Sequence, residues 1–153
     1  MENNTSAPCR ILSLDGGGAK GFYTLGVLKE IEAMLGCPLY QRFDLIFGTS
    51  TGAIIATLIA LGNAIDEIHE IYKQHVPTVM ACRSRRTRTA ALAELAKTVF
   101  ADKSFADAKT HIGVVTAKWM TERPMIFKRD IQQAHGLKGT FVPGFGVSIA
   151  DAV

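Results

Sequence analysis

The chain has 153 residues, a length that suffices for one domain with a buried core. Hydrophobic residues make up 48% and charged residues 20%, a globular composition that excludes intrinsic disorder. A net charge of +3 is too small to indicate binding to a nucleic acid polymer, and three scattered cysteines argue against disulfide and zinc sites. The apolar runs are too short to span a membrane and no secretory signal is visible, so we expect a cytoplasmic protein.

The first half of the chain alternates strand and helix patterns. Residues 1–9 predict a polar tail, followed by a domain over residues 10–153. Residues 10–14 predict a strand that is buried on both faces, and apolar residues then recur at helical spacing over residues 21–35. A second strand is predicted over residues 43–47 and a second helix over residues 52–62. This order predicts an α/β fold with a mainly parallel sheet.

The second half is less regular. Its pattern predicts helices over residues 63–75 and 90–100, separated by a surface loop over residues 76–90. Residues 111–118 and 124–128 predict a β-hairpin. A last helix, capped by Ser148, begins close to the end of the sequence and is too short there to bury an apolar face. We therefore expect the domain to be truncated at its C-terminus.

The predicted strand-to-helix turn carries the sequence Gly48-Thr49-Ser50-Thr51-Gly52. A serine between two glycines at such a turn is the pattern of a nucleophile elbow, in which a side chain on either flank would clash. The serine hydroxyl would then stand at the positive N-terminus of the following helix. A structural alternative is that small residues merely allow the helix to pack closely on the strand.

Three glycines, Gly16, Gly17 and Gly18, follow the first predicted strand. Without side chains, their backbone N–H groups can converge on one oxygen, and the next helix adds its positive end at the same place. One strand–helix–strand unit separates Gly18 from Ser50, so both loops are expected at the same edge of adjacent strands. Together the two motifs predict acyl transfer by Ser50 with an oxyanion hole in the glycine loop.

The pattern Gly16-x-Gly18-x-x-Gly21 also fits a dinucleotide-binding fingerprint. Two features weaken that interpretation. Asp15 precedes the glycines, where it would repel a pyrophosphate, and the far end of the second strand lacks the acidic residue that would bind a ribose. The acyl-transfer interpretation is the stronger one.

The segments Asp15-Gly-Gly-Gly-Ala-Lys-Gly21 and Gly48-Thr-Ser-Thr-Gly52 resemble the two motifs of the patatin-like phospholipase family, Asp-Gly-Gly-Gly-x-Arg-Gly and Gly-x-Ser-x-Gly. The resemblance is close over residues 10–62 and loose from there to Val153. It implies a three-layer α/β/α fold and lipid acyl hydrolysis by a Ser–Asp dyad, without a metal or other cofactor. Ser50 is the nucleophile implied by the resemblance. Lys20 stands where the family has arginine and lacks the planar guanidinium fork.

The aspartate of the dyad has no counterpart in this sequence. In the family it lies in an Asp-Gly-Gly or Asp-Gly-Ala motif downstream of the elbow, and the only Asp-Gly pair here is at Asp15. The remaining candidates have other neighbours: Asp66, Asp102, Asp107, Asp130 and Asp151. We therefore expect the base to lie beyond Val153 and these residues alone to be inactive.

Four histidines, His69, His75, His111 and His135, offer a Ser–His mechanism as an alternative. Their positions in helical, strand-start and polar segments favour solvated or capping roles. A non-catalytic binding or assembly module that keeps the hydrolase fold is the alternative function.

Four arginines lie within the segment Arg83–Arg88. They indicate either a solvated surface loop or attraction to anionic phospholipid headgroups, and contact with a regulatory partner or another subunit is equally consistent. The family resemblance implies a phospholipid substrate at the inner membrane surface. It extends to bacterial anti-phage phospholipase effectors, some switched on by cyclic oligonucleotides, so a cyclic nucleotide activator and a homo-oligomer are further candidate partners.

Overall fold

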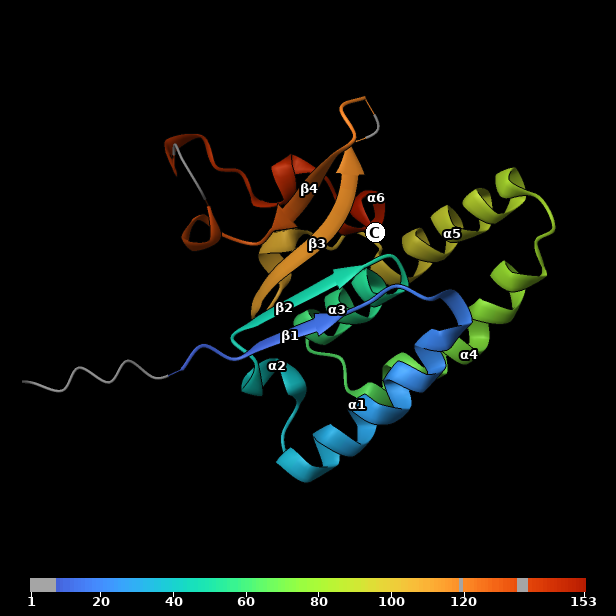
Figure 1. Ribbon diagram of the computed structural model, residues 1–153, viewed down its shortest axis with the longest axis horizontal. Helices are drawn as coiled ribbons and strands as arrows, with labels where there is room; N and C mark the ends of the chain where they lie inside the picture. The colour runs from blue at the N-terminus through green and yellow to red at the C-terminus, as the bar shows by residue number, and fades with distance from the viewer. Residues whose placement is uncertain (1–7, 119, 135–137) are drawn as a thin grey trace, which may run out of the picture.

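The computed structural model describes residues 8–118, 120–134 and 138–153, so most of the predicted tail over residues 1–9 lies outside it. Four strands, β1 (Ile11–Leu14), β2 (Leu45–Thr49), β3 (His111–Lys118) and β4 (Arg123–Lys128), form one sheet in that order (Figure 1). β1, β2 and β3 are parallel and β4 is antiparallel to β3. The predicted α/β class, the mainly parallel sheet and the hairpin are confirmed.

Six helices accompany the sheet in the described residues: α1 (Gly21–Leu35), α2 (Leu39–Arg42), α3 (Thr51–Leu61), α4 (Ile65–Ala81), α5 (Arg85–Phe100) and α6 (Ile149–Ala152). A short 3-10 helix over Gly18–Lys20 leads into α1. No helix in the described part of the chain is long and apolar enough to cross a membrane.

α3 is the central helix of the core and packs against β2 (Figure 1). Apart from two threonines, it contains only glycine, alanine, leucine and isoleucine, and 8 of its 11 residues are buried. A helix that is apolar on all sides must be covered on all sides. The buried hydroxyl of Thr57 is satisfied within the helix, because it donates to the Ala53 carbonyl oxygen at 2.7 Å. The helix therefore buries its apolar surface without leaving this hydroxyl unsatisfied.

α1 and α4 pack against each other beside this core. The rings of Phe22 and Tyr72 meet edge to face, with their centroids 5.7 Å apart. Leu25 and Leu28 of α1 and Ile68 of α4 are fully buried. This contact places one face of α4 next to the first turn of α1, directly after the glycine loop.

The prediction that the first strand is buried on both faces is wrong. β1 is an edge strand of the sheet among the described residues, and Ile11 is 55% exposed while Leu14 is buried. A short apolar run fits both a central and an edge strand, so the sequence pattern did not distinguish them.

The prediction of a loop over residues 76–90 is also wrong. α4 continues through Pro77 to Ala81, and α5 begins at Arg85 after a short connection. Pro77 lies on the exposed side of α4, whereas Val79 is buried, so packing offsets the backbone hydrogen bond that proline cannot make. The Ser84 hydroxyl oxygen accepts the Thr87 N–H at 3.1 Å and caps α5.

The predicted cap of the last helix is confirmed. The Ser148 hydroxyl oxygen accepts the Asp151 N–H at 3.2 Å. The expectation that this helix is too short to bury an apolar face is wrong, because Ile149 and Ala152 are buried against the rest of the core. α6 packs on α5 and brings Val153 to the wall of the cavity described below.

Candidate active site

Ser50 connects β2 to α3 in a strained backbone conformation. Its φ of 51° and ψ of −127° lie in a region that residues with a side chain rarely adopt. Its carbonyl oxygen accepts the N–H groups of Ala53 at 2.8 Å and Ile54 at 3.3 Å, which begins the helix. The side chain itself is exposed, so the hydroxyl is accessible at the positive end of α3.

The two glycines that flank this turn are required by close backbone contacts. A Cβ atom on Gly48 would lie 2.3 Å from the Gly52 carbonyl oxygen, and one on Gly52 would lie 2.2 Å from the Leu14 carbonyl oxygen. The expectation that a side chain on either flank would clash is confirmed. A strand, a strained serine and a helix in this order have the geometry of a nucleophile elbow.

The glycine loop lies directly beside Ser50. Because β1 and β2 are parallel neighbours, the segments that follow them meet at one edge of the sheet, as predicted. A Cβ atom on Gly16 would lie 2.9 Å from the Cβ atom of Ser50 and 3.2 Å from the Thr49 carbonyl oxygen. Gly18, two residues on, donates its N–H to the hydroxyl oxygen of Thr51 at 3.0 Å.

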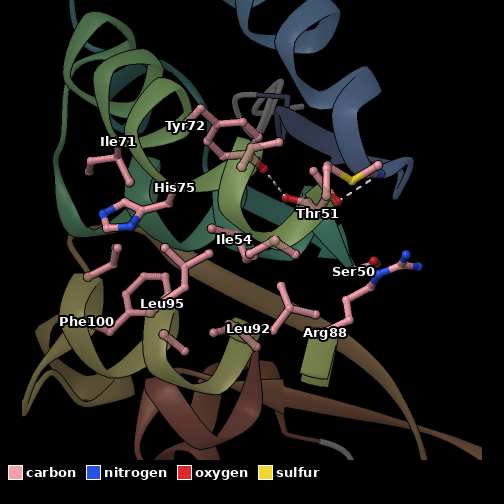
Figure 2. Close-up of a pocket in the computed structure, with 17 residues that line it drawn as sticks. Ser50, Thr51, Ile54, Ile71, Tyr72, His75, Arg88, Leu92, Leu95 and Phe100 are labelled. Carbon is pink, nitrogen blue, oxygen red and sulfur yellow. Dashed lines mark hydrogen bonds between the residues drawn. The ribbon is translucent and has the colours of Figure 1, made fainter. Parts of the chain in front are cut away.

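Thr51 and Tyr72 join this site although neither was assigned a role from the sequence: Thr51 is an unassigned position of the serine motif, and Tyr72 lies outside both motifs. The Tyr72 hydroxyl donates to the Thr51 carbonyl oxygen at 3.1 Å (Figure 2). Burial raises the pKa of Tyr72 above its usual value, so its hydroxyl stays a proton donor even at alkaline pH where an exposed tyrosine would ionise. Gly21 lies between them, since a Cβ atom there would be 2.7 Å from the Tyr72 ring and 2.8 Å from the Thr51 methyl group. Helical periodicity placed Tyr72 on a buried face but gave no sign of its polar partner.

A largely apolar cavity of about 350 Å³ opens beside Ser50 between α3, α4 and α5 (Figure 2). Its walls carry mainly aliphatic side chains: Ile54, Ile71, Val76, Val79, Met80, Leu92, Leu95, Ala96, Val99 and Val153. Gly18, Ser50 and Thr51 belong to the same lining. Such a cavity fits a hydrocarbon chain whose polar end reaches the serine. Val76, Val79 and Met80 are spaced as on one face of a helix, and this pattern could have predicted the wall. The three residues lie in the segment that was expected to be a loop.

The two charged residues of the first motif do not enter the cavity lining. Asp15 and Lys20 are exposed, and the Lys20 stem lies beside Gly17, where an added Cβ atom would be 3.2 Å from the Lys20 Cβ atom. No ion pair of either residue occurs within the described ranges.

Within the described ranges, no imidazole or carboxylate is hydrogen-bonded to Ser50. His69 packs edge to face on Phe22, and His111 Nδ1 lies 2.9 Å from a carboxylate oxygen of Asp130. His75 lines the cavity beside Ile71, away from Ser50 (Figure 2). His135 lies outside the described residues.

The other aspartates considered as bases have different partners. Asp66 pairs with Lys29 at 2.5 Å, and Asp107 accepts the Ser104 N–H at 2.7 Å. Asp151 accepts the Ser148 hydroxyl at 2.7 Å. Asp102 is exposed. The described residues also contain no group of three or more His, Cys, Asp or Glu side chains that could bind a metal ion.

Three arginines of the basic segment, Arg85, Arg86 and Arg88, lie in the first turn of α5. All are exposed, and that turn contains no acidic residue to offset their repulsion by the positive helix end. Arg88 donates to the Cys82 carbonyl oxygen at 3.0 Å and lines the cavity that contains Ser50. The basic segment therefore borders the mouth of the candidate active site.

The fold and the geometry at Ser50 define the class of α/β proteins with a nucleophile elbow beside a glycine-rich loop. Residues 12–153 match the patatin-like phospholipase family, and the chain belongs to this family.

Individual relatives agree with this assignment. A cUMP-AMP-activated phospholipase of Escherichia coli is 72% identical over 145 residues, which are 95% of this chain and 45% of the relative. A cGAMP-activated phospholipase of Pseudomonas aeruginosa is 32% identical over 129 residues, which are 77% of this chain and 39% of the relative. The human calcium-independent phospholipase A2-gamma is 42% identical over 66 residues, 42% of this chain and 8% of the relative. The chain thus spans less than half the length of these curated relatives.

Proposed function

We propose that the protein containing this chain is a lipid acyl hydrolase that cleaves membrane phospholipids. The observation that carries this proposal is the strained, exposed Ser50 at the mouth of an apolar cavity. The family and the names of the relatives support the same chemistry.

In this mechanism the Ser50 oxygen attacks the ester carbonyl carbon while its proton passes to a base. Negative charge develops on the carbonyl oxygen, and the backbone N–H groups of the Gly16-Gly17-Gly18 loop stabilise it. As the tetrahedral intermediate collapses, the ester C–O bond breaks, the base returns its proton to the departing alcohol, and an acyl-enzyme remains. The base then takes a proton from water as the water attacks the acyl carbon, and returns it to the Ser50 oxygen as the fatty acid leaves. The acyl chain occupies the cavity between α4 and α5 throughout. Lys20, beside Gly17, adds positive charge near the loop.

The base is proposed to be an aspartate beyond Val153. Each described aspartate outside the glycine motif is either exposed or bound elsewhere, and the matched segment covers only 45% of the Escherichia coli relative. The 153-residue chain alone should then hydrolyse esters far more slowly than the natural protein that contains it. Equal rates would show that the base lies within these residues.

Hydrolysis of phospholipids and short-chain esters by the natural protein, beside Ser50→Ala, tests the function. We expect the substitution to lower kcat by at least about 1,000-fold, because no other described group replaces the nucleophile. A fluorophosphonate probe, which reacts covalently with an activated serine, distinguishes the hydrolase from the alternative of a non-catalytic module. Covalent labelling of Ser50 supports the enzyme, whereas an unlabelled, inactive protein that still binds lipid supports the module.

Regulation by a cyclic dinucleotide is part of the proposal, because two relatives are named as cUMP-AMP-activated and cGAMP-activated phospholipases. A nucleotide-dependent hydrolase of this kind would serve as an anti-phage effector at the inner membrane surface. Activity assays with and without cUMP-AMP decide the point, and a rate that is unchanged over the full range of nucleotide concentration would exclude this activator.

A further inference from the structure

Thr51, at the start of α3, contacts the glycine loop, α4 and the start of α1. Its hydroxyl oxygen accepts the Gly18 N–H at 3.0 Å, its carbonyl oxygen accepts the Tyr72 hydroxyl at 3.1 Å, and its methyl group packs on Gly21. Thr51 follows Ser50 directly in the chain, so every displacement of Thr51 moves the nucleophile as well.

These contacts help to hold Ser50 in its strained backbone conformation. Ser50 keeps a backbone conformation that costs on the order of 1–3 kcal/mol and persists only where the surroundings hold it. The Tyr72 side chain is buried and comes from α4, so the Tyr72–Thr51 bond fixes the first turn of α3 to a separate helix. The Gly18–Thr51 bond fixes the loop to the same point.

We propose that Thr51 and Tyr72 are positioning residues that hold the glycine loop at the correct distance from Ser50, and that the Gly18 N–H is an anchor of the loop. The oxyanion is then held by the N–H groups of Gly16 and Gly17. This inference rests on the proposed hydrolase function and refines its oxyanion hole, because the Gly18 N–H is already donated to Thr51.

The test compares Thr51→Val, Thr51→Ser and Tyr72→Phe in the natural protein. Valine keeps the shape of threonine but cannot accept the Gly18 N–H, whereas serine retains the hydroxyl. We expect Thr51→Val and Tyr72→Phe each to lower kcat and the rate of fluorophosphonate labelling by about 10-fold or more, with KM within about 2-fold, since misplaced donors act on the transition state. Thr51→Ser should restore most of the rate.

Matched controls remove equivalent hydroxyl groups elsewhere. Thr57→Val deletes a buried hydroxyl in the same helix, and Tyr40→Phe deletes a tyrosine hydroxyl that contacts Gln41. Both should label at the wild-type rate. Thermal melting identifies loss of folded protein, and rates are expressed per folded molecule.

The outcomes separate the inference from the function on which it rests. A wild-type protein that labels and hydrolyses, with Thr51→Val equally active, would overturn the inference and leave the hydrolase intact. A faster Thr51→Val would also overturn it and would assign the Gly18 N–H to the oxyanion. All variants are assayed in the presence of cUMP-AMP and, separately, cGAMP. A wild-type protein without labelling or turnover under both conditions would overturn the proposed function, and the inference with it.

Discussion

At the scale of single residues, the backbone of Ser50 is strained because it must turn sharply between β2 and α3. The turn leaves no room for a side chain at Gly48 or Gly52, whose added Cβ atoms would approach carbonyl groups to 2.3 Å and 2.2 Å. Rigid backbone surrounds both positions, so neither contact can be relieved by a rotamer change. The requirement for glycine is therefore steric and local.

Replacing Gly52 with alanine should destabilise the protein by about 3 kcal/mol or more, because the new methyl group meets the Leu14 and Asp15 carbonyl groups. Gly26 provides the matched control. It is exposed on α1 and an added Cβ atom meets nothing within 4 Å, so Gly26→Ala should stabilise by about 1 kcal/mol through helix propensity. Urea denaturation measures both values. Similar changes at the two glycines would contradict the steric argument.

Residue types in a fixed local pattern were sufficient to predict the tight turn at Ser50 and the position of the glycine loop beside it. Their partners were not predictable in the same way. Tyr72 reads as one more buried position on an amphipathic helix, and its hydrogen bond to Thr51 depends on how α4 packs against α3. Spacing along a sequence reports which face a residue occupies and gives no information on the atoms that it meets there.

At the scale of elements, α5 shows how a pattern can hide a helix boundary. Residues 90–100 have clear apolar spacing, but the first turn contains mainly arginine and threonine, so the helix start was placed too late. The cap was present as Ser84, three residues before Thr87. In α4 the predicted boundary was too early, because Pro77 indicated that the helix ends before it. The helix continues past Pro77 because the buried Val79 packs in the next turn.

The side chains that α5 contributes to the cavity wall should limit the length of the acyl chain that the protein accepts in its substrates. Ala96 is buried and lines the cavity, so Ala96→Leu fills part of its volume. We expect the ratio of kcat/KM for palmitoyl over butyryl esters to fall by about 10-fold, since methylene-sized changes in a hydrophobic pocket have effects of this order.

Ala93→Leu is the control for this change, because Ala93 lies on the exposed side of the same helix. Its chain-length profile should equal that of the wild-type protein. A profile for Ala96→Leu that also remains unchanged would mean that the acyl chain binds elsewhere.

At the scale of the whole molecule, positive charge gathers at one end although the net charge is only +3. The turn between α4 and α5 stands at the edge of the molecule (Figure 1). The turn carries Arg83 and the start of α5 carries Arg85 and Arg86, all exposed. Exposed Met80 lies beside this turn. A basic segment next to an exposed apolar side chain suits contact with an anionic lipid surface.

Changing Arg83, Arg85 and Arg86 to glutamine should weaken binding to phosphatidylglycerol vesicles by about 100-fold, at about 1 kcal/mol for each charge. Binding to phosphatidylcholine vesicles should change little. Vesicle co-sedimentation of the natural protein measures both. The triple substitution of exposed Lys97, Lys103 and Lys118 is the control of equal charge, and an equal loss from it would assign the effect to net charge.

The order of strands in the sheet also has a consequence for synthesis on the ribosome. β1, the glycine loop, α1, α2, β2 and α3 all precede Gly62, and β1, β2 and α3 contact one another. β3 joins β2 only after α4 and α5 have been made. Contacts between nearby segments form with the smaller loss of chain entropy. The serine turn thus needs only contacts that are available early in translation, and α5, which completes the wall of the cavity, is added afterwards. Under the proposed function, a nascent chain would carry its nucleophile before it has a cavity that could hold a lipid.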